Sequence, residues 1–122
     1  MTPQPPVPHP GSLSLSTHWP EPDVVVLSVA GDLDMLTSPQ LSESLQKLLE
    51  RSPRRIVVDL TKVDFLGSAG LAALVTAHER VESRESLRIV ASARETQRAF
   101  QMTGLDELLA LYPTAEAALA DG

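Results

Sequence analysis

The sequence predicts an α/β domain with a mixed, mostly parallel β-sheet and the element order β-β-α-β-α-β-α-β-α. Short runs rich in β-branched residues, such as Val24–Ala30 and Ile56–Leu60, alternate with stretches in which leucine and alanine recur at helical spacing. Glycine, proline, serine and aspartate gather where one pattern gives way to the next. Strands that alternate with helices favour a parallel sheet with right-handed crossovers.

The first two strands are expected to form an antiparallel or mixed edge of this sheet. In Leu13–Thr17 apolar residues alternate with serines, which is typical of an edge strand. Pro20 and Pro22 then indicate a turn. Val24–Ala30 is apolar enough to be buried on both faces, so the second strand belongs in the interior of the sheet.

The first helix has clear punctuation at both ends. It follows a loop at Gly31–Asp34, and Ser38 is expected as its N-cap with Pro39 at the first helical position. Pro53 closes the segment. Its apolar positions repeat at helical spacing: Leu41, Leu45, Leu48 and Leu49.

The second half of the chain repeats the alternation of strand and helix. Ser92 and Glu95 form a capping-box pattern for the third helix, which Gly104 is expected to end. Pro113 and Thr114 precede a small alanine-rich helix. The other expected elements are a strand at Ile56–Leu60, a helix at Ser68–Ser83, a strand at Leu87–Ala91 and a strand at Leu108–Tyr112.

Length and composition limit the classes of protein that the chain can belong to. A chain of 122 residues fits one domain, and the absence of cysteine excludes disulfides, thiolate metal sites and cysteine nucleophiles. The net charge of −6 argues against a nucleic-acid backbone or an anionic membrane surface as partner. No apolar run approaches the roughly 20 residues of a membrane span, and no secretory signal is visible, so a cytoplasmic location is expected.

Residues 1–11 differ in composition from the rest of the chain. This segment holds half of the ten prolines, which fix φ and remove backbone donors. We expect a disordered, polyproline-like tail here, followed by a single domain at 12–121. A ligand for a proline-binding partner is the alternative interpretation of the segment.

Ser68 is the first candidate functional residue. It is predicted to stand where a strand and loop give way to a helix, and a helix N-terminus presents unpaired N–H groups and a positive dipole end that favour a phosphate. The plainer interpretation is an N-cap serine, and the two are compatible. A catalytic nucleophile is disfavoured, because no G-x-S-x-G pattern surrounds Ser68 and His78 lies nearly three turns along the helix.

A helical wheel divides the predicted second helix into two arcs. The arc expected to face the sheet carries Leu71, Leu74, Val75, His78 and Val81. The opposite arc is small near Ser68, which would let another backbone approach closely, although alanine is also an ordinary surface helix former. This expected outer arc consists of Ala69, Ala72, Ala73, Thr76 and Arg80.

Three aspartates raise the question of a metal site. Asp32 and Asp34 follow the second strand, and Asp59 lies near the end of the central strand. Phosphoacceptor sites of this kind need convergent carboxylates at the carboxyl ends of strands, usually with a lysine, and no lysine lies near the last strand. Turn formation by aspartate is the favoured interpretation, so no metal or other cofactor is expected.

Four stretches together resemble the STAS domain family, and more narrowly the bacterial anti-sigma factor antagonists. They are GDLDMLTSPQL, IVVDLTKVDFLGSAGLAALVTAHERV, LRIVAS and MTGLDELLALYPTAEAAL, and the resemblance covers about residues 12–121. The most specific part is the pattern D-L-x-x-V-x-F-[LMI]-x-S-x-G-L from Asp59 to Leu71. The resemblance implies a single STAS-like domain without catalysis of its own.

The resemblance also implies a switch. In this family a kinase-type anti-sigma factor phosphorylates the serine that matches Ser68, whereas the unphosphorylated protein binds that factor and frees a sigma factor. Asp34 matches an aspartate in the upstream loop, and Asp32 stands where glutamate is common. The family often has Asp and Ser on either side of the serine, where this chain has Gly67 and Ala69.

The implied partners are an anti-sigma factor that is a serine kinase and a serine phosphatase, and the free chain is expected to be a monomer. The alternatives are a STAS subunit of another assembly, such as a lipid-transport ATPase or a stress-signalling scaffold, and a small hydrolase or receiver-like phosphoprotein. The expected partner-binding residues are Asp32, Asp34, Gly67, Ser68, Ala69, Ala72, Ala73 and Thr76.

Overall fold

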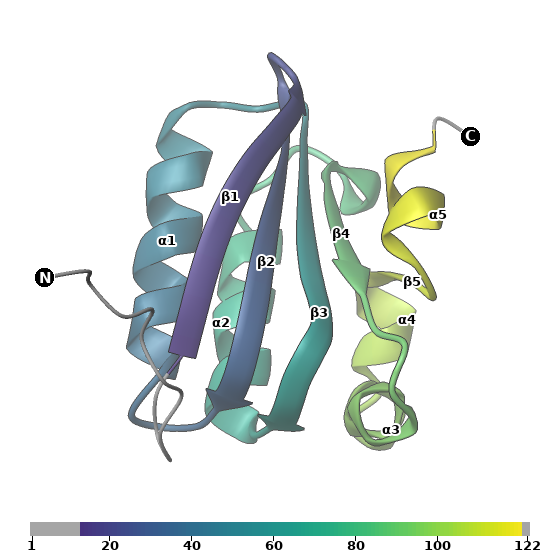
Figure 1. Ribbon diagram of the computed structural model, residues 1–122. Coiled ribbons are helices and arrows are strands. Elements are labelled where there is room, and N and C mark those ends of the chain that lie inside the picture. Colours follow the sequence, from purple (N-terminus) through teal and green to yellow (C-terminus); the bar gives the residue numbers. More distant parts are fainter. Residues whose placement is uncertain (1–12, 121–122) are drawn as a thin grey trace, which may run out of the picture.

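A five-stranded sheet in the order β1-β2-β3-β4-β5 organises the computed structural model, which describes residues 13–120 (Figure 1). β1 pairs with β2 antiparallel, and the other neighbouring strands are parallel, which confirms the predicted fold class. The expected tail at 1–11 and the expected domain ends at 12 and 121 lie outside the described residues. The strands are β1 (Leu13–Glu21), β2 (Val24–Leu33), β3 (Arg55–Leu66), β4 (Leu87–Val90) and β5 (Ala110–Tyr112).

Helices cover the two faces of the sheet unequally. α1 and α2 pack side by side on one face, and α5 covers only the part of the other face that lies over β3, β4 and β5 (Figure 1). The open part over β1 and β2 has a hollow of about 350 Å³ lined by polar residues such as Ser16 and Asp59 together with apolar ones such as Leu15. The helices are α1 (Ser38–Glu50), α2 (Ser68–His78), α3 (Arg94–Met102), α4 (Leu105–Leu108) and α5 (Ala115–Leu119).

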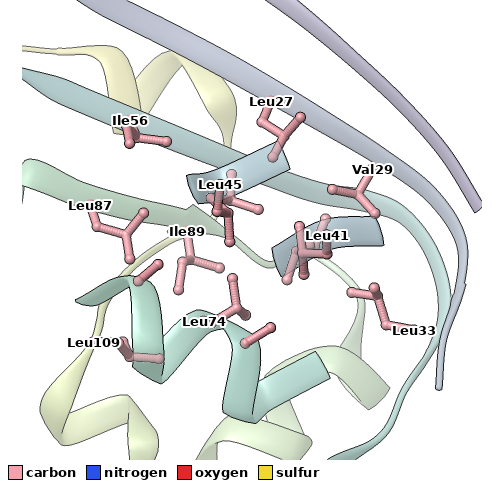
Figure 2. Packing of buried hydrophobic residues seen from close by; sticks show 14 of the residues in the cluster. Leu27, Val29, Leu33, Leu41, Leu45, Ile56, Leu74, Leu87, Ile89 and Leu109 are labelled. Carbon is pink, nitrogen blue, oxygen red and sulfur yellow. The ribbon is translucent and has the colours of Figure 1, made fainter. Parts of the chain in front are cut away.

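The main core lies between the sheet and the pair α1 and α2. Leucine, isoleucine and valine side chains from β2, β3 and β4 point toward Leu41 and Leu45 of α1 and Leu74 of α2 (Figure 2). A second, smaller cluster on the other face joins Val26, Val57 and Val90 to Ala118 of α5. The interior strands are therefore buried on both faces only where α5 reaches them.

Several element boundaries differ from the sequence-based expectation. The expected strand at Leu108–Tyr112 begins only at Ala110, because Leu105–Leu108 forms the short helix α4 after Gly104, which adopts a left-handed conformation with φ of 73°. α2 ends at His78 instead of Ser83, and a 3₁₀ turn at Arg84–Ser86 leads into β4. Short apolar runs are compatible with helix or strand, so tertiary packing decides between them.

The helix caps were predicted correctly only in part. Thr37, not Ser38, is the N-cap of α1, and Ala93 is the N-cap of α3, so the capping box of Ser92 and Glu95 is wrong. Thr114 does cap α5, because its hydroxyl oxygen accepts a hydrogen bond from the Ala117 N–H at 3.0 Å. Caps depend on backbone geometry within one residue, which composition does not resolve.

Candidate functional site

The junction between β3 and α2 places Ser68 at the carboxyl edge of the sheet. β3 ends at Leu66, and the Gly67 N–H donates to the Leu33 carbonyl at 2.8 Å, which ties the junction to the end of β2. Gly67 is the N-cap of α2, and Ser68 is its first helical residue, so the interpretation of Ser68 as N-cap is wrong by one position. Ser68 is exposed and lies on the first turn of α2, at the end of the helix that carries the positive end of its dipole.

Tight packing beneath this junction explains the glycines on both sides of it. A Cβ at Gly67 would lie 3.0 Å from the Phe65 ring and 3.3 Å from the Leu33 carbonyl oxygen. A Cβ at Gly70 would lie 2.9 Å from side-chain atoms of both Leu33 and Leu66. A side chain at position 67 would therefore require a small shift of the Phe65 ring, whereas one at position 70 would press on two leucines of the core.

The exposed side of α2 is narrower than the helical wheel predicted. Ser68, Ala72 and Thr76 are exposed and Ala69 is half-buried, but only 7% of Ala73 is exposed. Ala73 lines a small gap between α2 and α1, beside Leu45. The expectation that Ala73 lies on the outer surface is wrong, because α2 is covered by α1 as well as by the sheet.

His78 stands at the end of α2, away from Ser68. It is half-buried as expected, and its buried Nδ1 atom has no hydrogen-bond partner among residues 13–120. It lies on the last residue of the helix, and Ser68 lies on the first. The structure therefore does not bring the two residues together.

The loop between β2 and α1 is shaped by Asp34. Its Oδ1 atom accepts hydrogen bonds from the Leu36 N–H at 2.9 Å and the Thr37 N–H at 3.0 Å, and the Thr37 hydroxyl lies 3.1 Å away. The Thr37 hydroxyl in turn donates to the Asp32 carbonyl at 2.6 Å. The Thr37 N–H is the main reason that the pKa of Asp34 lies below its ordinary value. Asp34 thus has the turn-forming role that the sequence favoured over metal binding.

Large apolar side chains are exposed at the same edge of the sheet as Ser68, and they were not among the residues predicted for the site. Met35 is 83% exposed, Leu36 79% and Phe65 55%. We call these three residues the apolar rim. For Met35 and Leu36 the sequence did contain a signal: they are a pair of apolar residues inside a tight turn, between Asp34 and its hydrogen-bond partner Thr37. Single exposed apolar residues are common, but three at one edge of a sheet indicate a contact surface.

Two irregularities in the pairing of β2 with β3 place Phe65 on this surface. The register shifts between Ser28 and Ala30 and again between Gly31 and Asp32, so β3 contains extra residues relative to β2. After the second shift Asp32 pairs with Phe65, and Leu33 pairs with Leu66. Leu33 and Leu66 pack against the core, so their neighbours Asp32 and Phe65 point to the open face.

No group of three or more potential metal-binding side chains occurs within residues 13–120. Asp59 accepts a hydrogen bond from the Thr61 N–H at 3.0 Å, as expected for an aspartate that shapes the local backbone. No helix in the described part of the chain is long and apolar enough to cross a membrane.

The fold and this site define a class of protein that comparison with known families identifies. The model of the STAS domain matches residues 20–118, and the chain belongs to the STAS domain family. Within this family, the chain is similar to individual proteins named anti-sigma factor antagonists. The chain is 34% identical over 96 residues to the anti-sigma-F factor antagonist RsfB of Mycobacterium tuberculosis, and the match spans 79% of each protein.

Solved structures agree with this relationship. An anti-sigma factor antagonist from Mycobacterium paratuberculosis is 35% identical to the chain, has a TM-score of 0.85, and is matched over 93% of this chain and 96% of its own. The anti-sigma factor antagonist SpoIIAA in its unphosphorylated form has a TM-score of 0.64 at 13% identity, with 85% of this chain and 92% of its own covered. At that identity SpoIIAA shares the fold alone.

Proposed function

We propose that this chain is an anti-sigma factor antagonist that is switched by phosphorylation of Ser68. When Ser68 is unphosphorylated, the chain binds a kinase-type anti-sigma factor, which then releases its sigma factor. The similarity to proteins named anti-sigma factor antagonists supports the general role. The structural observation that carries it is an exposed serine on the first turn of α2, at the same edge of the sheet as the apolar rim.

The geometry separates the effect of a phosphate on the fold from its effect on binding. A phosphate on Ser68 adds a charge of roughly −1.5 to −2. The positive end of the α2 dipole favours that charge, so the domain should remain folded. A partner that covers the apolar rim, however, would have to desolvate the phosphate, and binding would fail.

We revise the proposed partner-binding surface according to which of its residues are exposed. We keep the exposed and half-buried residues of the original set and add the apolar rim. Ala73 would act only indirectly, through the packing of α1 on α2. The chain would need no catalysis of its own, since the anti-sigma factor would supply the kinase and a separate serine phosphatase would restore Ser68. The proposed surface consists of Asp32, Asp34, Met35, Leu36, Phe65, Gly67, Ser68, Ala69, Ala72 and Thr76.

Phosphate mapping and binding measurements test the proposal together. The chain is incubated with candidate anti-sigma kinases and ATP, and phosphate is located by mass spectrometry. We expect it on Ser68, with Ser68→Ala binding the anti-sigma factor regardless of ATP and Ser68→Asp binding weakly. Ser92→Asp is the matched control, because Ser92 is also exposed and follows β4 at the same edge of the sheet.

Two outcomes would contradict the proposed switch. One is phosphate at another residue together with unchanged binding by Ser68→Asp. The other is an equal loss of binding in Ser68→Asp and Ser92→Asp, which would show that any negative charge at this edge disturbs the interface. Stable capture of a transporter ATPase or a scaffold by the unmodified chain would favour the alternative role as a subunit of another assembly.

A further inference from the structure

We infer that β1 pairs antiparallel with β1 of a second copy of this chain, which joins the two five-stranded sheets into one. The inference is independent of the proposed function, because it concerns the edge of the sheet that β1 forms and not the carboxyl ends of the strands, where Ser68 lies. It replaces the expectation that the free chain is a monomer.

The two edges of the sheet are protected to different degrees. β5 forms one edge with only the three residues Ala110–Tyr112, and Pro113 follows at once. β1 forms the other edge with the nine residues Leu13–Glu21, and its pairing with β2 is regular from Leu13 to His18 (Figure 1). No strand among residues 13–120 pairs with the outer side of β1, so its outward N–H and C=O groups can pair with another strand.

The charges that usually prevent pairing at a sheet edge are missing from most of β1. From Leu13 to Trp19 the strand has no aspartate, glutamate, lysine or arginine, although the chain carries a net charge of −6. Protection begins only at the end of the strand, where the register shifts between His18 and Glu21 and Pro20 lacks an N–H. Two acidic copies would therefore meet little direct charge repulsion along this stretch.

An apolar row on β1 is only partly covered. Leu13, Leu15 and Trp19 pack against the main core, but all three are half-buried. Leu27 and Val29, in the neighbouring strand, are at most 1% exposed. The apolar side chains of β1 therefore stand at the margin of the core, and a further strand beside β1 would continue the row and cover them.

A second β1 fits this edge because the strand is complementary to itself. A two-fold axis perpendicular to the sheet at Ser16 places Leu13 opposite Trp19 of the second copy. Leu15 then lies opposite Thr17, so the apolar and methyl-bearing side chains of both copies share one face. The serines of both strands share the other face. The same surface patch thus serves on both copies, as a two-fold interface requires.

The acidic turn after β1 favours the antiparallel direction. Glu21 and Asp23 lie at this turn, and Arg54 offsets only one of their two charges. A parallel pair would place the two turns side by side, whereas an antiparallel pair places them at opposite ends of the shared edge. The register centred on Ser16 uses the whole uncharged stretch and leaves Pro20 outside it.

The oligomeric state of the full chain tests the inference. Sedimentation over a range of protein concentrations should give the parent twice the chain mass of 13.1 kDa. Ser16→Lys places two like charges opposite each other on the axis and should reduce the mass to that of one chain. Ser92→Lys is the matched control, because it adds the same charge at an exposed serine away from β1, and it should keep the doubled mass. Circular dichroism checks that both variants are folded.

Single cysteines test the register. The chain has no cysteine, so Ser16→Cys gives one thiol per copy. Residues directly opposite each other in an antiparallel pair have Cα atoms about 4.5 or 5.5 Å apart, and both distances permit a disulfide. In Ser14→Cys, the control, the two thiols would be about 14 Å apart along the edge, which is too far. Under oxidation Ser16→Cys should form a cross-linked dimer, and Ser14→Cys should not.

Three outcomes would overturn the inference. They are a parent chain that sediments as one copy at every concentration, a Ser16→Lys variant that keeps the doubled mass, and equal cross-linking by the two cysteine variants. None of these measurements contains a kinase or ATP, so a negative result leaves the proposed phosphorylation of Ser68 untouched. Conversely, absence of phosphate on Ser68 would change neither the mass nor the cross-links.

Discussion

The two ends of the sheet are closed in different ways. At the amino ends of the parallel strands, polar contacts join residues that are far apart in the chain. Arg54 pairs with Asp23 at 3.1 Å and with Glu21 at 3.5 Å, and the Arg84 side chain donates to the carbonyls of Leu108 and Leu109 at 3.2 and 2.9 Å.

The carboxyl ends are closed mainly by local contacts. Here Asp34 bonds residues two and three positions away, and the main link between strands at Ser68 is the bond from Gly67 to Leu33. Met35, Leu36 and Phe65 stay exposed at this end. One end of the sheet thus joins distant parts of the chain, whereas the other builds a short, self-supporting loop that presents apolar groups. The difference favours the carboxyl end as the place where partners bind.

The largest expected effect concerns the side of α2 that α1 covers, next to the carboxyl end of the sheet. Ala73→Arg places a long, charged side chain between α1 and α2 and should lower the free energy of unfolding by about 1–3 kcal/mol, as overpacked sites do. Ala72→Arg, one residue earlier and exposed, should change it by no more than about 0.5 kcal/mol. Denaturant unfolding of both variants measures the difference. Equal losses would show that α2 is covered differently from the structure described here.

A smaller effect is expected at the amino end. Arg54→Ala removes exposed ion pairs, which individually contribute roughly 0.2–1 kcal/mol. We expect a loss within that range that shrinks as salt is added, and no change in phosphorylation of Ser68. Glu43→Ala, which removes the exposed pair with Lys47 on α1, serves as control, because that pair lies within one helix and joins no strands. A loss of kinase recognition in Arg54→Ala would contradict the inference that the anti-sigma factor binds only at the carboxyl end of the sheet.

The smallest expected effect concerns the pH dependence of stability. The folded-state pKa of Asp34 lies below its ordinary value of 3.8, so its charged form stabilises the fold above about pH 4, and this contribution is lost as the pH falls through the folded pKa. Asp34→Asn should therefore be slightly less stable than the parent at neutral pH, with the difference narrowing below about pH 4. Urea unfolding between pH 3 and pH 7 measures the difference. A difference that widens on acidification would contradict this role of Asp34.

Much of the architecture could be predicted from local patterns. The β-branched runs at Val24–Ala30 and Ile56–Leu60 form interior strands, and the break at Gly67–Ser68 begins α2. These predictions succeed because the periodicity of a strand or a helix depends on residues that are close together in the sequence. For the same reason Ser68 could be singled out before the structure was known, although its place in the helix was wrong by one residue.

The candidate site could be predicted less completely. A helical wheel treats one helix alone, so it could not show that α1 covers Ala73 from the side. The wheel also could not place Phe65 on the open face, since that depends on register shifts between β2 and β3.

The sequence by itself determined the order of strands and helices apart from the short helix α4, the largely parallel sheet and the position of Ser68 near a helix N-terminus, because each follows from short-range hydrophobic patterns and backbone preferences. Only the tertiary structure decided which side of α2 is free and which apolar side chains lie at the same edge of the sheet as Ser68. Those features depend on contacts between residues distant in sequence, where packing and strand register, not local preference, set what is exposed.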